Sequence, residues 1–245
     1  MISPALLKTR IFLPALLSAT ALLLSACDDA QPRAGATAPG AAPPVTTGAP
    51  PPLAPPPLAV PPPDLPDSAL PSAAAPPRNL DVSVLHMGRL VVALERTAMR
   101  DVQHEIGAGV FDEQGDGGDF RTWLCYTTPH QQRVWLISSQ TGSGMFVNSF
   151  VLERDASAEA TDHCPALPAA YTPVVLEPDL HLGTPQHQVE HLFGDPQGGA
   201  DAWKTYSRTE SSNHDSLHFD IAHWLAVKYD NGAISAIAAR KTTSN

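Results

Sequence analysis

The sequence lacks the motifs that mark the common classes of enzyme. It contains no G-x-S-x-G nucleophile elbow, no Walker phosphate loop, no dinucleotide-binding fingerprint and no H-E-x-x-H zinc motif. A hydrolase mechanism therefore has no recognisable nucleophile from which to start. We expect a protein that is not an enzyme and that carries no cofactor.

Basic side chains are also few. The chain has 15 lysines and arginines against 25 aspartates and glutamates, a net charge of −10. Without the first 26 residues, 13 basic side chains remain against 25 acidic ones and the net charge is −12. This balance argues against nucleic-acid binding, because nucleic-acid-binding surfaces are basic. The acidic surface either favours a basic partner or serves solubility alone.

No apolar run is long enough to be read as a membrane span. The run from Ile11 to Leu24 is interrupted by Pro14 and falls short of the roughly 20 residues that a bilayer requires. Lys8 and Arg10 precede this run and small residues follow it, which is the pattern of a cleaved export signal. We assign residues 1–26 to a signal peptide.

The signal ends in Leu24-Ser25-Ala26-Cys27, which resembles the lipobox of bacterial lipoproteins. In such lipoproteins the cysteine thiol carries diacylglycerol and becomes the mature N-terminus. The resemblance implies lipidation at Cys27 and a protein that its N-terminal lipid holds on a membrane, facing the periplasm of the bacterial cell envelope. An ordinary secreted protein is the alternative. Asp28-Asp29 resembles an inner-membrane retention signal, and the choice between inner and outer membrane stays open.

Cysteine is scarce, with three in the chain and no C-x-x-C redox motif. With Cys27 lipidated, Cys125 and Cys164 remain as an even pair in an oxidising compartment, which predicts a disulfide between them. The alternative is two unpaired buried thiols.

Residues 27–78 read as a linker. Between Gln31 and Arg78, 17 of 48 residues are proline and most of the others are small, so we expect no contribution to a packed core. Proline triplets begin at Pro50, Pro55 and Pro61 and favour an extended polyproline II conformation. The segment is predicted to be a disordered, semi-rigid tether that holds the folded part away from its membrane. Recognition by a polyproline-binding module is the alternative.

The rest of the chain contains an internal repeat. The stretch from His181 to Pro196 reads as a short helix, with Thr184 as its N-cap, Pro185 in its first turn and Gly194 as its stop. An offset of 87 residues places similar residues in a first copy, and a W-x-x-Y pair follows each copy. The matching residues are Thr97, Val102, His104 and Gly107 against Thr184, Val189, His191 and Gly194, then Trp123 and Tyr126 against Trp203 and Tyr206.

Hydrophobic periodicity predicts the elements of each copy. Apolar residues recur at spacings of three and four between Val84 and Ile106, which predicts one amphipathic helix that ends at Gly107. Alternating residues predict antiparallel strands, with a hairpin turn at Asn231-Gly232. The predicted strands are 121–127, 133–139 and 145–152 in the first copy and 202–208, 217–221, 225–229 and 234–239 in the second.

We therefore predict an α+β fold with two tandem units, residues 79–170 and 171–245. Each unit would pack its helix or helices on a three- to four-stranded antiparallel meander, and the disordered proline-rich tether would precede the first unit.

The second unit also resembles a known family. The pattern L-G-T-P-x-x-x-V-x-x-x-F-G-x-P at Leu182 to Pro196, the following W-x-x-Y and the stretch from Val227 to Ile237 are similar to the SmpA/OmlA (BamE-type) envelope lipoproteins. This resemblance implies a helical hairpin on a three-stranded antiparallel sheet, and binding of other envelope proteins without catalysis. Two such units in tandem resemble the beta-lactamase inhibitory protein family, whose members grip an enzyme with a concave sheet. No binding residue of either family maps onto this chain.

Two groups of side chains could bind a small ligand. Trp135 and Trp224 hold similar places in the two copies and are either core residues or a stacking platform for glycan. His187 and His191 are four residues apart on the predicted helix, so they either chelate Zn²⁺ or Cu²⁺ or belong to a solvated polar face. Further ligands in the metal reading would come from His181, His214, His218 and His223.

The predicted function is that of a non-catalytic protein-binding module in the cell envelope, active in envelope assembly or in the inhibition of a partner protein. A periplasmic protein that binds metal through histidines, or one that binds glycan, is the alternative.

Overall fold

The computed structural model describes residues 59–66, 77, 79–116, 120–139, 145–199, 202–214 and 217–244. The predicted signal peptide, the lipidation site Cys27 and the first part of the linker lie outside these residues. Within them, no helix is long and apolar enough to cross a membrane.

Ten strands and two α-helices follow one another along the described part of the chain. The first half contains β1 (Val84–Met87), β2 (Leu90–Ala93), α1 (Met99–Ile106), β3 (Asp112–Gln114), β4 (Arg121–Thr128), β5 (Gln132–Ser138) and β6 (Ser149–Arg154). The second half contains the 3₁₀ turn η2 (Ala169–Tyr171), β7 (Val174–Leu176), α2 (Gln186–Phe193), β8 (Trp203–His214), β9 (Leu217–Asp230) and β10 (Ala233–Ser244).

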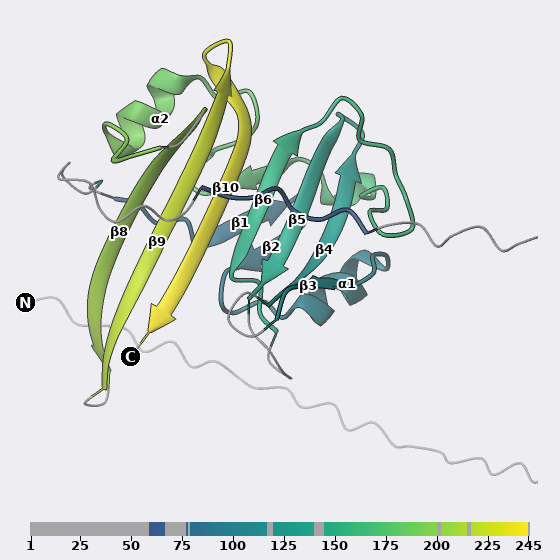
Figure 1. The fold of residues 1–245 in the computed structure, drawn as a ribbon, viewed down its shortest axis with the longest axis horizontal. Coiled ribbons are helices and arrows are strands. Elements are labelled where there is room, and N and C mark those ends of the chain that lie inside the picture. The colour runs from purple at the N-terminus through teal and green to yellow at the C-terminus, as the bar shows by residue number, and fades with distance from the viewer. Residues whose placement is uncertain are drawn as a thin grey trace, which may run out of the picture. The chain divides into compact units, whose positions relative to one another are not determined.

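A seven-stranded antiparallel sheet organises the fold (Figure 1). Its strand order is β3-β4-β5-β6-β10-β9-β8, so strands from the two halves of the chain lie in one sheet. The halves join where β6 pairs with β10, from Ser149 opposite Arg240 to Glu153 opposite Ala236. This pairing satisfies the backbone groups of two strands that would otherwise be exposed edges.

The predicted fold of two tandem helix-plus-meander units is wrong. The structure is mostly β, with 48% strand, two sheets of three and seven strands, and two α-helices among the described residues. The small sheet has the order β2-β1-β7 and also combines both halves. One large core includes Leu85, Leu136, Val189 and Leu225, which come from both sides of residue 170. Strand pairing and a shared core therefore fuse the two meanders.

The single helix predicted from Val84 to Ile106 is also wrong over most of its length. Residues 84–93 form the hairpin of β1 and β2, and only α1 is helical. Gly88 turns the hairpin with a φ of 53° and donates a hydrogen bond to the Pro173 carbonyl at 2.9 Å. A Cβ at Gly88 would clash with the backbone of Ala170. This close approach is a tertiary contact, which the periodicity of apolar residues does not reveal.

Helix α2 begins one residue later than predicted. Thr184 does not cap it and instead accepts, through Oγ1, a hydrogen bond from the backbone N–H of His181 at 3.1 Å. Both helices stop at the predicted glycines, Gly107 with a φ of 75° and Gly194 with a φ of 82°.

The predicted strands are confirmed in both halves. Strands β4, β5 and β6 match the first three, although β6 begins at Ser149, and the predicted pair 217–221 and 225–229 is one long strand, β9. The predicted hairpin between β9 and β10 is present, with Asn231 and Gly232 at φ angles of 50° and 76°.

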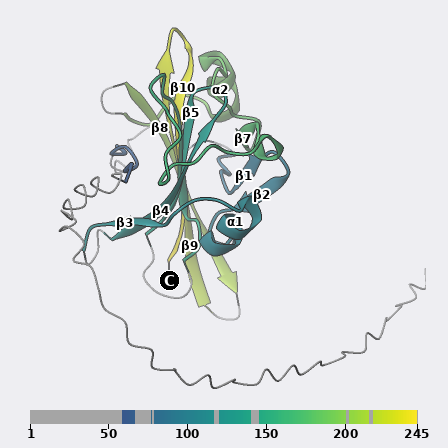
Figure 2. The same cartoon turned by 90° about the vertical axis from the view of Figure 1, so that its right-hand side faces the viewer.

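Both faces of the large sheet carry clusters of buried apolar side chains. Figure 2 shows it nearly edge-on, with the helices and the small sheet on one side. Leu136, Phe150 and Leu225 belong to the main core on that side. Alternate residues on the same strands face the other side and form a second apolar cluster of their own.

Candidate functional site

All four tryptophans of the chain lie on the second face of the large sheet. Trp123 on β4, Trp135 on β5 and Trp224 on β9 are only 2%, 2% and 5% exposed, and Trp203 on β8 is half-buried. They share a face because they occupy the same phase of the two-residue alternation. We call this surface the tryptophan face, and its other members are Cys125, Ile137, Val151, Cys164, Ala226 and Ala238.

Strand register sets the arrangement of the large and small side chains on this face. Trp135 lies opposite Val151 on β6, Val151 opposite Ala238 on β10, and Ala238 opposite Ala226 on β9. Small side chains thus occupy the centre of the face, between the tryptophans of β4 and β5 and those of β8 and β9.

Residues 59–66, part of the predicted disordered tether, lie across this face. In Figure 1 this dark-blue segment passes in front of β4, β5 and β6. The indole N–H groups of Trp123 and Trp135 both donate to the carbonyl oxygen of Val60, each at 3.1 Å. Val60 and Leu65 also pack against the apolar cluster. The prediction that the tether contributes nothing to a packed core is therefore wrong for this segment.

The chemistry of the segment matches that of the face. A tryptophan indole N–H can only donate a hydrogen bond, and a proline offers a carbonyl acceptor but no N–H. Pro61, Pro62 and Pro63 keep the chain extended, so little conformational entropy is lost when it docks. A proline-rich segment therefore supplies acceptors where the face supplies donors.

Burial along the segment has a period of three between Val60 and Pro66. The exposed positions are Pro61 and Asp64, and Pro62 between them is buried. The remaining positions are half-buried, and they are Val60, Pro63, Leu65 and Pro66. Polyproline II has about three residues per turn, so one edge of the segment faces solvent and the other two rest on the sheet. Proline-rich peptides dock on aromatic surfaces in this way.

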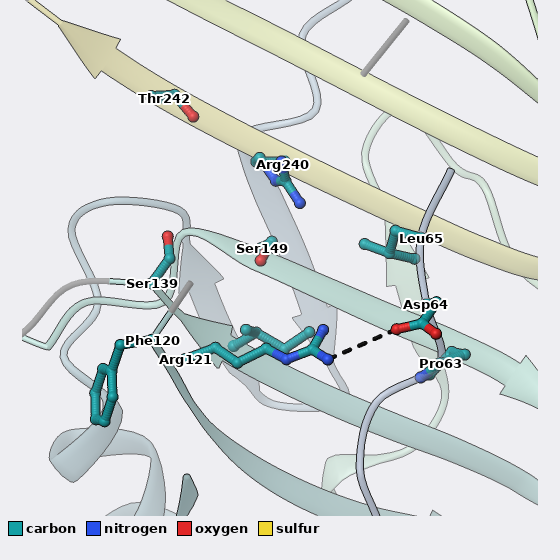
Figure 3. Close-up of a pocket in the computed structure, with 10 residues that line it drawn as sticks. Pro63, Asp64, Leu65, Phe120, Arg121, Ser139, Ser149, Arg240 and Thr242 are labelled. Atoms are coloured by element: carbon teal, nitrogen blue, oxygen red, sulfur yellow. Dashed lines mark ion pairs between the residues drawn. The ribbon is translucent and has the colours of Figure 1, made fainter. Parts of the chain in front are cut away.

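A pocket of about 390 Å³ lies beside the end of the segment (Figure 3). Asp64 and Leu65 line it on the segment's side, and Arg121, Ser149 and Arg240 line it on the sheet's side. Nη2 of Arg121 is 3.7 Å from Oδ1 of Asp64. The segment therefore leaves room on the face, in a place that combines positive charge with hydroxyl groups.

Two arginines stack on tryptophan rings of the face. The guanidinium carbon of Arg133 is 5.7 Å from the centre of the Trp135 ring, and that of Arg240 is 5.6 Å from the Trp224 ring. Arg133 also pairs with Asp155 at 3.0 Å. Arginine side chains therefore lie on this face of an otherwise acidic chain.

The indole of Trp224 differs from those of Trp123 and Trp135. Its N–H is buried, and no acceptor reaches it among the described residues. A buried donor without a partner costs roughly 1–3 kcal/mol. The segment therefore satisfies two indole donors of the face, whereas the third has no acceptor among the described residues.

The predicted disulfide is present. Cys125 on β4 is bonded to Cys164, and both belong to the tryptophan face. Next to the bond, the N–H of Thr127 donates to the Pro165 carbonyl at 2.9 Å, and the N–H of Leu167 donates to the Thr127 carbonyl at 2.7 Å. The bond and these contacts fix the segment after β6 along β4, at the edge of the face.

The candidate metal ligands lie on other parts of the fold. His187 and His191 are exposed on α2, which packs against the main core through Val189 and Phe193. The other candidates are spread out, with His181 exposed before α2, His214 at the end of β8, His218 exposed on β9 and His223 buried on β9. In the part of the chain that the structure describes, no three His, Cys, Asp or Glu side chains are grouped closely enough to hold a metal ion.

Sequence reasoning missed the role of residues 59–66, although a signal is present. The first two proline triplets are each followed by Leu-Ala, whereas the third is followed by Asp64 and Leu65. Asp64 is the first charged residue after Arg33, so it interrupts a long uncharged tract. This interrupting charge is the one that pairs with Arg121.

Comparisons with protein-family models, with characterised proteins and with solved structures found no match.

Proposed function

We propose that this protein is a membrane-anchored, periplasm-facing lipoprotein whose folded part is a non-catalytic protein-binding module of the cell envelope. Its partner binds the tryptophan face as an extended peptide. The observation that carries this proposal is the shared contact of Trp123 and Trp135 with the carbonyl of Val60, at 3.1 Å from each indole.

That contact supports peptide binding because it uses only the backbone of the bound segment. Indole donors that meet a main-chain carbonyl recognise an extended chain, while the surrounding rings bury its side chains. Aromatic residues of this kind also contribute most of the energy in peptide and protein interfaces. The lipobox at Cys27 and the proline-rich tether support the placement in the envelope, since together they would hold the module at a distance from its membrane.

Site-specific photocrosslinking in intact cells tests the proposal. Lys228 on β9 shares the alternation phase of Trp224, whereas Lys204 on β8 has the opposite phase and lies opposite Val227, the neighbour of Lys228. A photoreactive residue at 228 should give a discrete adduct with one envelope protein. The same residue at 204 is the matched control and should not.

Two further measurements identify the binding mode. Trp203→Ala, next to Lys228 in the register, should abolish the adduct, and mass spectrometry should map it to an extended segment of the partner. Equal adducts from positions 228 and 204, or none from either position, would overturn the proposal.

A glycan-binding protein is the second candidate, because four tryptophans gather on one face. Sugar stacking needs open rings, and residues 59–66 together with the sheet leave Trp123 and Trp135 only 2% exposed. Binding of soluble peptidoglycan fragments to the full chain, lost in Trp203→Ala, would favour this candidate. The metal-binding alternative would be favoured if the purified protein bound one equivalent of Zn²⁺ or Cu²⁺ and His187→Ala lost it.

A further inference from the structure

We infer that residues 59–66 are an intramolecular ligand that occupies the partner's site, and that the partner presents the same chemistry, an extended proline-rich peptide with an acidic residue after the prolines. The inference rests on the proposed function, because both concern the tryptophan face. It adds the class of ligand and a competition that restrains binding until a partner displaces the segment.

The segment is attached in the way a ligand is attached. It belongs to no strand, and no backbone-to-backbone hydrogen bond joins it to the described residues of the sheet. Its polar contacts with the described residues of the sheet are two indole donors on the carbonyl of Val60 and the pair of Asp64 with Arg121. Residues 67–76 separate it in sequence from the folded part, so it can leave the face without breaking a strand of the sheet.

Three contacts define which peptide the face accepts. The carbonyl before the first proline lies between Trp123 and Trp135, the carboxylate after the triplet faces Arg121, and the next residue, Leu65, packs on the apolar cluster. The triplets at Pro50 and Pro55 lack the acid, because Leu53 and Leu58 follow them. Peptides that contain these two triplets therefore show how much the carboxylate of Asp64 contributes to binding.

The segment fills the face incompletely, which allows another peptide to replace it. The pocket of about 390 Å³ remains open beside Leu65. The buried N–H of Trp224 has no acceptor among the described residues. A partner peptide that extends further along β10 gains contacts in this pocket, which Ser149, Arg240 and Thr242 line, and this gain offsets the high local concentration of the covalently attached segment.

The experiment compares the full chain with a variant in which glycine and serine replace residues 59–66 at unchanged length. The probe is a fluorescent synthetic peptide with the sequence of residues 59–66. We expect it to bind the variant at least about tenfold more tightly than the wild type, because the attached segment competes at an effective concentration of about 1 mM. The maximum of tryptophan emission should lie at longer wavelength in the variant than in the wild type, because Trp123 and Trp135 lose the cover of the segment. Addition of the peptide should shift the maximum back toward the wild-type wavelength.

Two control peptides test the specificity. An Asp64→Asn form of the peptide should bind the variant about two- to fivefold more weakly, as expected for a solvent-exposed ion pair. A peptide with the sequence of residues 49–58, which has two triplets and no acid, should also bind more weakly than the 59–66 peptide. Equal binding of all three peptides would overturn the assigned ligand class.

A second variant tests the inference even if the chain with residues 59–66 replaced does not fold. A protease site inserted within residues 67–76 of the otherwise natural chain leaves residues 59–66 intact. After cleavage, excess peptide should release the N-terminal fragment, and the rate of release should be higher when Trp135 is replaced by Phe. A fragment that peptide never displaces would make the segment a fixed part of the fold and overturn the inference.

The two proposals fail in different ways. If the peptide does not bind the folded variant but residue 228 still crosslinks to one envelope protein, the inference fails and the proposed function stands. If the peptide binds and competes but no crosslink forms in cells, the intramolecular ligand stands and the proposed function fails.

Discussion

Trp123 and Trp135, on neighbouring strands, donate their indole N–H groups to one acceptor, the carbonyl oxygen of Val60. A carbonyl oxygen has two lone pairs, so both donors are satisfied by a single atom. The residues after Val60 are prolines and offer no N–H of their own. The docking of the segment on β4 and β5 is therefore concentrated on one peptide group.

Trp135→Phe should weaken this docking by about 1 kcal/mol, the usual net value of a neutral hydrogen bond. A double-mutant cycle isolates that value from the loss of ring volume. The free energy of unfolding in urea is measured for the wild type, for Trp135→Phe, for the chain with residues 59–66 replaced, and for the combination. We expect Trp135→Phe to cost less once the segment has been replaced.

Trp224→Phe is the matched control for that cycle. It replaces an indole of the same face by the same phenyl ring, but the indole N–H of Trp224 has no acceptor among the described residues, so the cost of this substitution should not depend on the segment. A cycle energy near zero for Trp135, or one of equal size for Trp224, would contradict the importance of the Val60 contact.

Replacing both Cys125 and Cys164 by alanine should lower the free energy of unfolding by about 4 kcal/mol in the chain-entropy account, since the bond closes a loop with a sequence separation of 39 residues. Because β6 pairs with β10 and the two halves share a core, we expect the loss of stability to affect both halves of the large sheet. Amide exchange should rise in β4 to β6 and in β8 to β10 together. Faster exchange in the first half alone would show that the two halves open independently.

Local patterns allowed much of the large sheet to be predicted. Short runs rich in β-branched and aromatic residues, bounded by turn residues, placed β4, β5 and β8 to β10. Asn231-Gly232 predicted its hairpin because both residues readily adopt positive φ angles. The disulfide was predicted by counting cysteines in a chain with a predicted export signal. Each of these signals is contained within a short stretch of sequence or in the composition.

The errors all involve contacts between distant parts of the chain. The β1 and β2 hairpin depends on Gly88 fitting against the backbone of Ala170, and the joined sheet depends on β6 pairing with β10. Residues 59–66 have the composition of a linker, and only the tryptophan face gives them a place to dock.

His223 should make stability depend on pH. It is buried on β9, and that burial lowers its pKa, although Asp81, whose Oδ1 is 3.8 Å from Nδ1, acts in the opposite direction. The other charged groups around it are Lys241 and Arg208, which also lower its pKa, and Glu210, which raises it. The folded state therefore binds fewer protons than the unfolded state near the ordinary histidine pKa of about 6.5.

This contribution to stability is fully present above pH 6.5, roughly the unfolded-state pKa, and is lost as the pH falls through the lower folded-state pKa. The free energy of unfolding should thus decrease between about pH 7 and pH 5 more steeply in the wild type than in His223→Gln. Parallel curves for the two proteins in this window would show that His223 does not contribute.

Cys27→Ser should abolish anchoring to the membrane. If Cys27 carries diacylglycerol and a further acyl chain, two or more hydrophobic chains hold the wild type stably on the bilayer, whereas a serine cannot form the thioether. Metabolic labelling with a clickable palmitate analogue should mark the wild type and leave Cys27→Ser unlabelled. In fractionation, the wild type should remain with membranes through a high-salt wash, and Cys27→Ser should accumulate as an uncleaved precursor or as a soluble periplasmic form.

The protein with both Cys125 and Cys164 replaced is the control, because it has lost two cysteines and should still be labelled. Equal release of the wild type and Cys27→Ser into the soluble fraction would show that the lipobox resemblance is incidental and that the tether serves a secreted protein.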